Sequence, residues 1–314
     1  MNIEILGTES LGVRGLCCTV ATEERIFLFD PGVALGYTRH HLLPHPFQVA
    51  IDEQVQEKIL QAWAGATDIV ISHFHGDHVP LTDANPFQLN AERIAGRTKG
   101  KRIWAKLSRL TALERERASR LASLLECGMT KAEGESCREV CFSAPVPHGK
   151  ECGRAAVMMT RVEDKKVFVH ASDIQLLNDE AVEQLLAWKP DILLLSGPPL
   201  YLSHRLTPEQ LTSARSRAER LARSVGTMII DHHLLRERCG IAWLEELRAG
   251  TNGNIMCAAD YMGKPRRLLE ADRRYLYKKM PVPAGWHEQY ARGKADTAGY
   301  LRKGLNNSTI DPPR

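Results

Sequence analysis

Six residues that follow a short apolar run constrain this 314-residue chain more than any other feature. The run IVIS at 69–72 is typical of a buried strand, and the segment HFHGDH at 73–78 follows it directly. Because side chains alternate in an extended backbone, His73 and His75 are expected to point the same way. Gly76 allows a tight turn that carries the last two residues of the segment toward a second position. One loop can therefore begin two neighbouring metal sites.

Apolar runs of strand length recur along the chain, and helical patterns separate several of them. The runs cover residues 26–29, 69–71, 167–169, 192–195, 228–230 and 255–258. Amphipathic patterns predict helices over 54–64 and 180–188, and a third helix begins at Thr207, Pro208 and Gln210, which form a capping box. This alternation is typical of a layered α/β protein.

Two segments depart from the alternation. Leucines near helical spacing among charged residues at 106–125 predict an inserted helix, and a solvated charged face is favoured there over a functional basic surface. After Lys264 the chain carries basic pairs and a polar end, which predict a tail laid over the surface and frayed at its end. The sequence thus divides into a main domain over 1–264, with a helical insertion near 100–126, and a C-terminal extension over 265–314.

Composition indicates a folded protein with a buried core, but it does not identify a binding partner. The apolar fraction of 43% is ample for a buried core, and a net charge of +4 is too small to identify a nucleic-acid-binding protein. No stretch approaches the roughly 18 apolar residues of a membrane span, and the first residues lack the pattern of a secretory signal. With eight cysteines that form no two-residue-spaced pairs, the chain is expected to be cytoplasmic, with reduced thiols and no membrane association.

Further residues of metal-binding type follow other predicted strands. Asp173 comes just after one apolar strand, and His232 and His233 come after another. His148 lies in a loop held by two prolines. Because ligands of open α/β sheets gather beyond the carboxyl ends of the strands, these segments are expected to converge on the loop that begins at His73.

In their order along the chain, these residues resemble the metallo-β-lactamase fold superfamily of metallohydrolases. The resemblance rests on the His-x-His-x-Asp-His signature at 73–78, the later His148 and Asp173, and the final histidine pair. It covers residues 1 to about 260. It implies an α/β fold of the α+β type, a four-layer αββα sandwich of two mixed β-sheets flanked by helices.

The resemblance also narrows the branch of the superfamily. It implies two similar halves, near 1–155 and 156–260, and the chain has no flavin-binding half and no export signal. The segment 106–125 does not reproduce the glycine-rich arm of transfer-RNA 3′ processing enzymes. The chain therefore looks closest to an uncharacterised, chiefly archaeal branch, and the resemblance does not supply its substrate.

Ligand roles follow from the same resemblance. It implies that one metal ion is held by His73, His75 and His148, that a second is held by Asp77, His78 and His232, and that Asp173 bridges the two. We favour His232 over the alternative, His233. His232 comes first after the strand, as the last ligand does in the transfer-RNA-processing branch. Nitrogen and oxygen ligands favour Zn²⁺ in both positions, with Mn²⁺ or Fe²⁺ as alternatives.

Such a pair of ions has a defined chemistry. Two ions about 3.5 to 4 Å apart lower the pKa of a shared water and leave a hydroxide at neutral pH, and Asp77 is suited to orient it and to move a proton. Asp30 is expected either to accept the N–H of a ligand histidine or to serve only in a turn. Tyr201 and His233 are candidates for substrate contact. A loop with His40, His41 and His45 is expected at the surface or rim.

Three functional hypotheses remain open. The leading one is a dinuclear metallohydrolase that cleaves a phosphodiester, nucleotide-like or part of RNA, and the basic surplus weakly favours such an anionic small-molecule or RNA substrate. The second is a thioester or lactone hydrolase with the same metal site. The third is a metal-bearing RNA-binding protein with little turnover. The sequence leaves the oligomeric state open, with a homodimer as one option.

Overall fold

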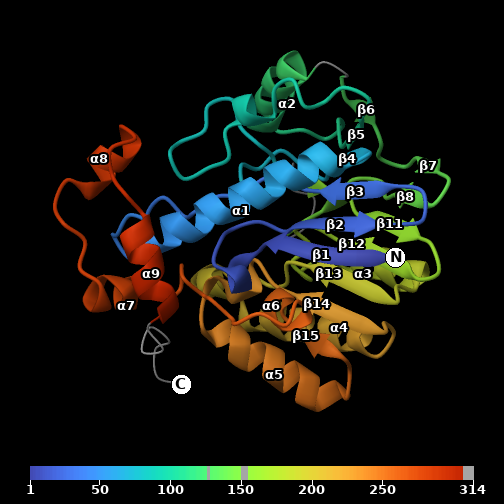
Figure 1. Ribbon diagram of the computed structural model, residues 1–314. Coiled ribbons are helices and arrows are strands. Elements are labelled where there is room, and N and C mark those ends of the chain that lie inside the picture. The colour runs from blue at the N-terminus through green and yellow to red at the C-terminus, as the bar shows by residue number, and fades with distance from the viewer. Residues whose placement is uncertain (126–127, 150–154, 307–314) are drawn as a thin grey trace.

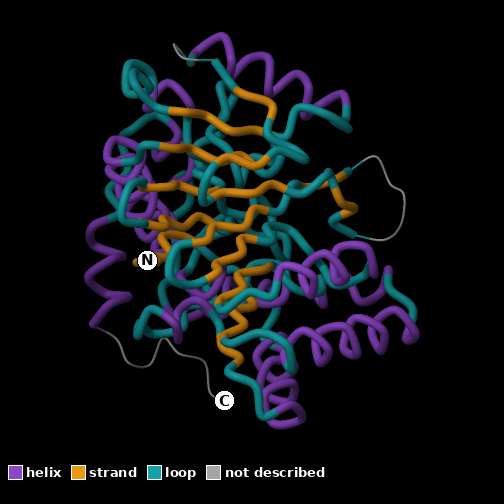
Figure 2. The backbone as a smooth tube through the Cα atoms, turned by 90° about the vertical axis from the view of Figure 1, so that its right-hand side faces the viewer, coloured by secondary structure: helices purple, strands orange, loops and turns teal. Residues whose placement is uncertain are grey.

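Two mixed β-sheets lie face to face in the computed structural model, with helices on both outer surfaces (Figure 1). The structure describes residues 1–125, 128–149 and 155–306. Phe29 of one sheet packs edge-on against Phe168 of the other, with ring centroids 6.0 Å apart, in a core between the sheets. The tube in Figure 2 shows the same layers from the side. The four-layer αββα sandwich predicted from the sequence is confirmed.

The first sheet is built from the N-terminal part of the chain. Its strands, in spatial order, are β1 (Asn2–Gly7), β2 (Cys17–Ala21), β3 (Ile26–Phe29), β4 (Asp68–Ile71), β5 (Arg102–Ala105) and β6 (Thr130–Lys131). The first three pair antiparallel, and β3 to β6 pair parallel. The carboxyl ends of β3 and β4 therefore lie at the same edge of the sheet.

The second sheet contains the later strands. In spatial order they are β15 (Ile255–Met256), β14 (Thr227–Ile230), β13 (Ile192–Leu195), β12 (Val167–His170), β11 (Thr160–Glu163), β8 (Val140–Phe142) and β7 (Ser136–Cys137). Strands β12 to β15 pair parallel, and β9 (Val146–Pro147) and β10 (Ala156–Val157) form a separate pair. Because β8 pairs with β11, the change of sheet falls between 131 and 136 and not near 155, where the sequence analysis divided the halves.

Helices cover the outer faces of both sheets (Figure 1). They are α1 (Pro46–Gly65), α2 (Ala112–Leu124), α3 (Asp179–Trp188), α4 (Pro208–Ala222), α5 (Cys239–Thr251) and α6 (Ala258–Tyr261), with 3-10 helices η1 (Glu9–Leu11), η2 (Ala91–Ile94), η3 (Leu200–Arg205) and η4 (Leu234–Arg236). The predicted capping box of Thr207 and Gln210 begins α4. Helix α1 starts earlier than predicted because His45 caps it. Among the described residues, no helix has the length and apolarity needed to cross a membrane.

The predicted insertion contains a shorter helix than expected. Helix α2 begins at Ala112, where Thr111 and Glu114 form a capping box, and its buried residues include Ala118 and Leu121. The preceding residues form a loop instead, whose backbone N–H groups at 107 and 108 donate to Glu133. Residue 126, at the predicted end of the insertion, lies outside the described residues.

The C-terminal extension is helical and packs into the body, which corrects the prediction of a surface tail. It forms α7 (Arg273–Lys279), α8 (Trp286–Ala291) and α9 (Ala298–Asn306), and α9 crosses α1 (Figure 1). Leu276, Met280 and Trp286 are buried in the apolar cluster around α1. An apolar face hidden among basic residues thus holds the extension in place. Residues 307–314, where fraying was expected, are not among those described.

Candidate metal centre

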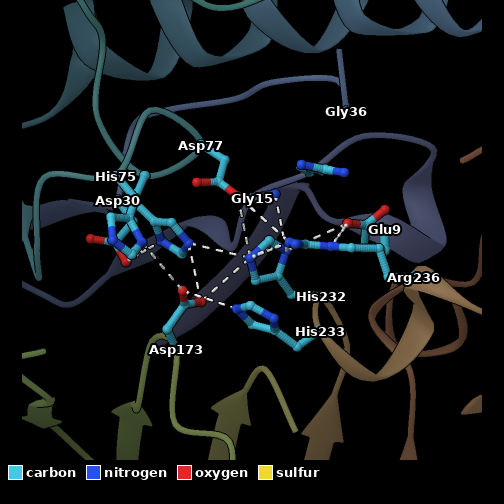
Figure 3. A network of polar contacts seen from close by, with 12 residues as sticks. Glu9, Gly15, Asp30, Gly36, His75, Asp77, Asp173, His232, His233 and Arg236 are labelled. Atoms are coloured by element: carbon cyan, nitrogen blue, oxygen red, sulfur yellow. Dashed lines mark hydrogen bonds and ion pairs between the residues drawn. The ribbon is translucent and has the colours of Figure 1, made fainter. Parts of the chain in front are cut away.

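Segments that follow four strands meet at one rim of the sandwich. Asp30 follows β3, the 73–78 loop follows β4, Asp173 follows β12, and the pair His232 and His233 follows β14. Figure 3 shows Asp173 and the histidine pair pointing toward one another, with Asp77 above them. Strand ends of both sheets therefore bring together side chains that are far apart in the sequence.

Asp173 lies at the centre of this cluster, and its two oxygens face different histidines. Oδ1 lies 3.1 Å from Nε2 of His78 and 3.4 Å from Nε2 of His232. Oδ2 lies 3.5 Å from Nε2 of His73 and 4.0 Å from Nδ1 of His75. A carboxylate with one oxygen toward each group of histidines has the arrangement that a bridging ligand requires.

The first ligand group contains His73, His75 and Asp173, whose ligand atoms lie within 4.8 Å of one another. The Ser72 hydroxyl donates to Asp30 and so accepts from Nδ1–H of His73, 2.9 Å away, which leaves the His73 lone pair at Nε2. That atom is buried and has no hydrogen-bond partner among the described residues. An open, buried lone pair beside a carboxylate fits a metal ligand.

His148 lies at the edge of the first group. Its ring centroid is 5.7 Å from that of His75 and 6.3 Å from that of His73. Nε2 of Gln175 lies 3.4 Å from its Nδ1, and its backbone carbonyl accepts from the N–H of Gln175. The structure thus brings His148 beside the other two histidines, and its role as a ligand stays a prediction.

The second ligand group contains Asp77, His78 and His232, again within 4.8 Å of one another. Nε2 of His232 lies 3.4 Å from Nε2 of His78 and 3.5 Å from Oδ2 of Asp77. His233 also faces Asp173: its Nε2 lies 3.1 Å from Oδ2, and His232, His233 and Asp173 form a further group of ligand atoms within 4.8 Å of one another. Its Nδ1 lies 3.0 Å from the hydroxyl of Tyr201. The choice of His232 as the ligand stays a prediction, as does a role for Tyr201.

Asp30 connects the strand ends beneath the cluster. Its carboxylate accepts the backbone N–H of Ser72 and the hydroxyls of Ser72 and Ser172, and Oδ2 lies 2.9 Å from Nδ1 of His78. Burial on its own raises the pKa of Asp30, but the hydrogen bond and charge of His78, with the charges of further histidines, lower it below its ordinary value. The contact directs Nε2 of His78 toward Asp173, as an outer carboxylate does for a metal-binding histidine.

The protonation states differ within the cluster. Burial lowers the pKa of His78, but Asp173 and Asp30, one at each ring nitrogen, raise it well above its ordinary value. Burial and the neighbouring histidines lower the pKa of His73 to about 3. Burial raises the pKa of Asp77, but His78 and other cationic neighbours bring it below its ordinary value. His73 is therefore ready to bind a metal ion, whereas His78 must first release a proton.

Sequence reasoning did not identify two charged residues of the site, Glu9 and Arg236. Arg236 is 5% exposed, and its Nε donates to Oε1 of Glu9 at 2.8 Å. One terminal nitrogen donates to Tyr201 at 3.1 Å. The other lies 2.9 Å from Nε2 of His232 (Figure 3). The position of Arg236 four residues after His232 is the signal that could have revealed it.

The donor set fits two divalent ions. Imidazole nitrogens and carboxylate oxygens suit zinc, iron or manganese. Two buried atoms that face the cluster have no hydrogen-bond partner among the described residues, Nε2 of His73 and Oδ1 of Asp173. Each belongs to a group whose ligand atoms already lie close together. Metal coordination would satisfy both.

Comparison with known proteins identifies the relatives of the chain. No protein-family model matches it. A UPF0282 protein of Methanosarcina mazei is 49% identical and covers 96% of this chain and 100% of the relative. A UPF0282 protein of Methanopyrus kandleri is 35% identical over 87% of this chain and 98% of its own length. A UPF0282 protein of Pyrococcus furiosus is 32% identical over 91% of this chain and 96% of its own length.

A solved structure also shows a likeness. It is the metallo-beta-lactamase fold protein YhfI from Bacillus subtilis, with a TM-score of 0.47 and 13% identity over 82% of this chain and 96% of that protein. The sequence relatives named above come from archaea, as expected for a chiefly archaeal branch. Because the archaeal relatives match over nearly their whole lengths, the chain belongs to the UPF0282 protein family.

Proposed function

We propose that the protein is a metal-dependent hydrolase with two divalent ions, and that it cleaves a phosphodiester that is nucleotide-like or part of RNA. The observation that carries the proposal is Asp173, a buried carboxylate with one oxygen toward each group of histidines. A ligand shared by two ions needs such a two-sided arrangement.

The ions would be held by this chain's own side chains. His73, His75 and His148 are assigned to the first position, Asp77, His78 and His232 to the second, and Asp173 to both, with Zn²⁺ as the expected metal. When bound, two such ions acidify a shared water and neutralise negative charge on a substrate oxygen. Proton transfer and substrate binding would depend on the residues around the ions.

Asp77 is the residue assigned to proton transfer. Its side chain is 19% exposed, while those of His78 and His232 are fully buried. The His75 side chain is 39% exposed, so the cluster reaches solvent at both of these residues. An ionised carboxylate at this opening can orient a water and accept its proton.

Basic side chains favour an anionic substrate. Arg236 lies at the second position, and two arginines of the 106–125 insertion contact the ligand loops. Arg117 donates to the carbonyl of Phe74 in the first loop, and Arg109 donates to the carbonyl of Pro145 in the loop before His148. Such charge raises the local concentration of a phosphodiester.

The test is hydrolysis of a model panel by metal-loaded protein. The panel holds an aryl phosphodiester, a cyclic nucleotide, a short RNA, a thioester and a lactone. Asp77→Asn should lower phosphodiester turnover by at least about 100-fold, the scale expected for a lost proton-transfer group. Asp83→Asn is the matched control, because Asp83 lies in the following segment, is half exposed and forms an ion pair with Arg120.

Several outcomes separate the hypotheses. Turnover of the thioester or lactone alone would replace the phosphodiester assignment and keep the metal centre. RNA binding without turnover of any substrate would favour a binding protein. Full activity of Asp77→Asn would remove Asp77 from the mechanism.

A further inference from the structure

A buried guanidinium lies among the ligands of the second metal position. One terminal nitrogen of Arg236 lies 2.9 Å from Nε2 of His232 and 3.6 Å from Oδ2 of Asp77. Both atoms belong to the second ligand group. Figure 3 shows the side chain reaching toward His232 on the side that faces Asp77. An ion that binds both residues would therefore lie beside a buried positive charge, which opposes its binding.

Contacts on its other side hold Arg236 in this place. Nε donates to Glu9, which is 2% exposed, and the second terminal nitrogen donates to the Tyr201 hydroxyl. The guanidinium carbon lies 5.1 Å from the Tyr201 ring centre. All three nitrogens of the group thus contact protein atoms, which fixes Arg236 against the ligands and leaves it little freedom to reach a substrate.

His232 is also in a different hydrogen-bonding state from His73. The backbone N–H of Gly15 donates to Nδ1 of His232 at 3.3 Å, so the ring proton is on Nε2 in this arrangement. One terminal nitrogen of Arg236 lies 2.9 Å from Nε2 and 3.2 Å from Nδ1, so the guanidinium contacts the ring as a whole. His73 instead keeps Nε2 without a hydrogen-bond partner among the described residues.

Binding a metal ion at His232 changes its present hydrogen bonding. To bind through Nε2, His232 needs its proton on Nδ1, the atom that now accepts from Gly15. Oε1 of Glu9, the carboxylate that holds Arg236, lies 3.8 Å from Nδ1, which is too far for a hydrogen bond. His73 of the first position already has its Nε2 open.

We propose that Arg236 makes the two metal positions unequal. The first position keeps its ion tightly, and the second binds weakly and exchanges, because the buried guanidinium lies beside Asp77 and His232. This inference rests on the proposed metal centre and adds which of its two ions is exchangeable.

The test is a metal titration of metal-stripped full-length protein. Zn²⁺ binding is followed by calorimetry, and Co²⁺ binding by its visible absorption. Wild-type protein should bind in two steps that differ by at least about 10-fold in affinity, a scale set by effects of outer-shell groups on metal sites. Arg236→Gln should tighten the second step by about 10- to 100-fold and leave the first unchanged.

Two further variants serve as controls, one that keeps the positive charge and one that removes a different arginine nearby. Arg236→Lys keeps a cation near the ligands and should keep the second step weak. Arg238→Gln removes a nearby arginine that pairs with Asp272 and should titrate like wild-type protein.

Each result has a defined reading. Two equal steps in wild-type protein would overturn the inference without any variant, so a folding failure of Arg236→Gln leaves the test intact. An unchanged or weaker second step in folded Arg236→Gln would also overturn it. If wild-type protein showed no tight first binding step, the proposed metal centre itself would be wrong.

Discussion

Two buried carboxylates, Asp30 at the metal centre and Asp52 in α1 beneath the C-terminal extension, have pKa values shifted in opposite directions. Both are fully buried. Asp30 accepts from Ser72 and Ser172 and contacts a histidine, and its pKa falls below the ordinary value. Asp52 accepts from Gln56, its Oδ1 has no hydrogen-bond partner among the described residues, and burial raises its pKa to about 8.

Buried histidines in the same two regions differ in a related way. Nδ1 of His45 accepts the N–H of Phe47, and Nε2 lies 2.8 Å from the carbonyl of Met280. His73 has one nitrogen in use and the other open toward Asp173. Burial lowers the pKa of His45 to about 4, so it is neutral like His73. What marks a candidate ligand here is the open lone pair, because burial and neutrality are common to both.

The comparison predicts its largest effect at Asp30. Asp30→Asn removes the charge opposite His78 and leaves donors poorly satisfied, so the free energy of unfolding should fall by about 3 to 5 kcal/mol, the scale of a broken buried pair. Urea unfolding at pH 7 measures this loss. Because the pKa of Asp30 is lowered on folding, its contribution is present above the ordinary value near 4 and is lost as the pH falls below it. A loss below about 1 kcal/mol would contradict the role of Asp30.

The next effect is on metal affinity and separates the adjacent histidines. His232→Ala should weaken the second metal position by about 10- to 100-fold or more, because His232 faces Asp77 and His78. His233→Ala should keep both ions and change substrate affinity or rate, because His233 contacts Asp173 from the Tyr201 side. Metal titration of the two variants measures this difference. The reverse pattern would move the ligand to His233 and leave the other assignments intact.

Patterns local in sequence predicted an α/β protein and the residues of metal-binding type after its strands, and the family resemblance implied the four-layer sandwich. Apolar runs such as 192–195 became strands as expected, because four consecutive apolar residues suit a strand covered on both faces. The cap of α1 was not predicted, since His45 is not a typical capping residue and was expected at the surface or rim, whereas it is fully buried.

Features that depend on distant contacts were not predictable in this way. Arg236 acquires its place through Glu9, 227 residues earlier in the chain, and no local pattern records that pairing. The helices after 264 are six to nine residues long, too short to be stable alone, and they depend on packing against the α1 cluster. The basic pairs and polar end of this segment, taken without those contacts, therefore predicted a tail.

The smallest predicted effect lies at Asp52 and has the opposite sign to that at Asp30. Folded Asp52 keeps its proton up to a pKa of about 8, whereas the unfolded chain releases it near 4. The stability that this group contributes is therefore fully present below about pH 4 and is lost as the pH rises toward 8. Asp52→Asn carries a neutral side chain at every pH and can still accept from Gln56, so it should escape that loss.

We expect Asp52→Asn to exceed wild-type protein by about 1 to 2 kcal/mol at pH 8, the scale of a poorly satisfied buried polar group, with a smaller gain at pH 5. Urea unfolding at pH 5, 6.5 and 8 measures the trend. Glu57→Gln is the matched control, since Glu57 lies on the same helix with its side chain 61% exposed and should change stability little. A gain that does not grow with pH would show that Asp52 is ionised in the folded protein, and the two buried carboxylates would then be alike.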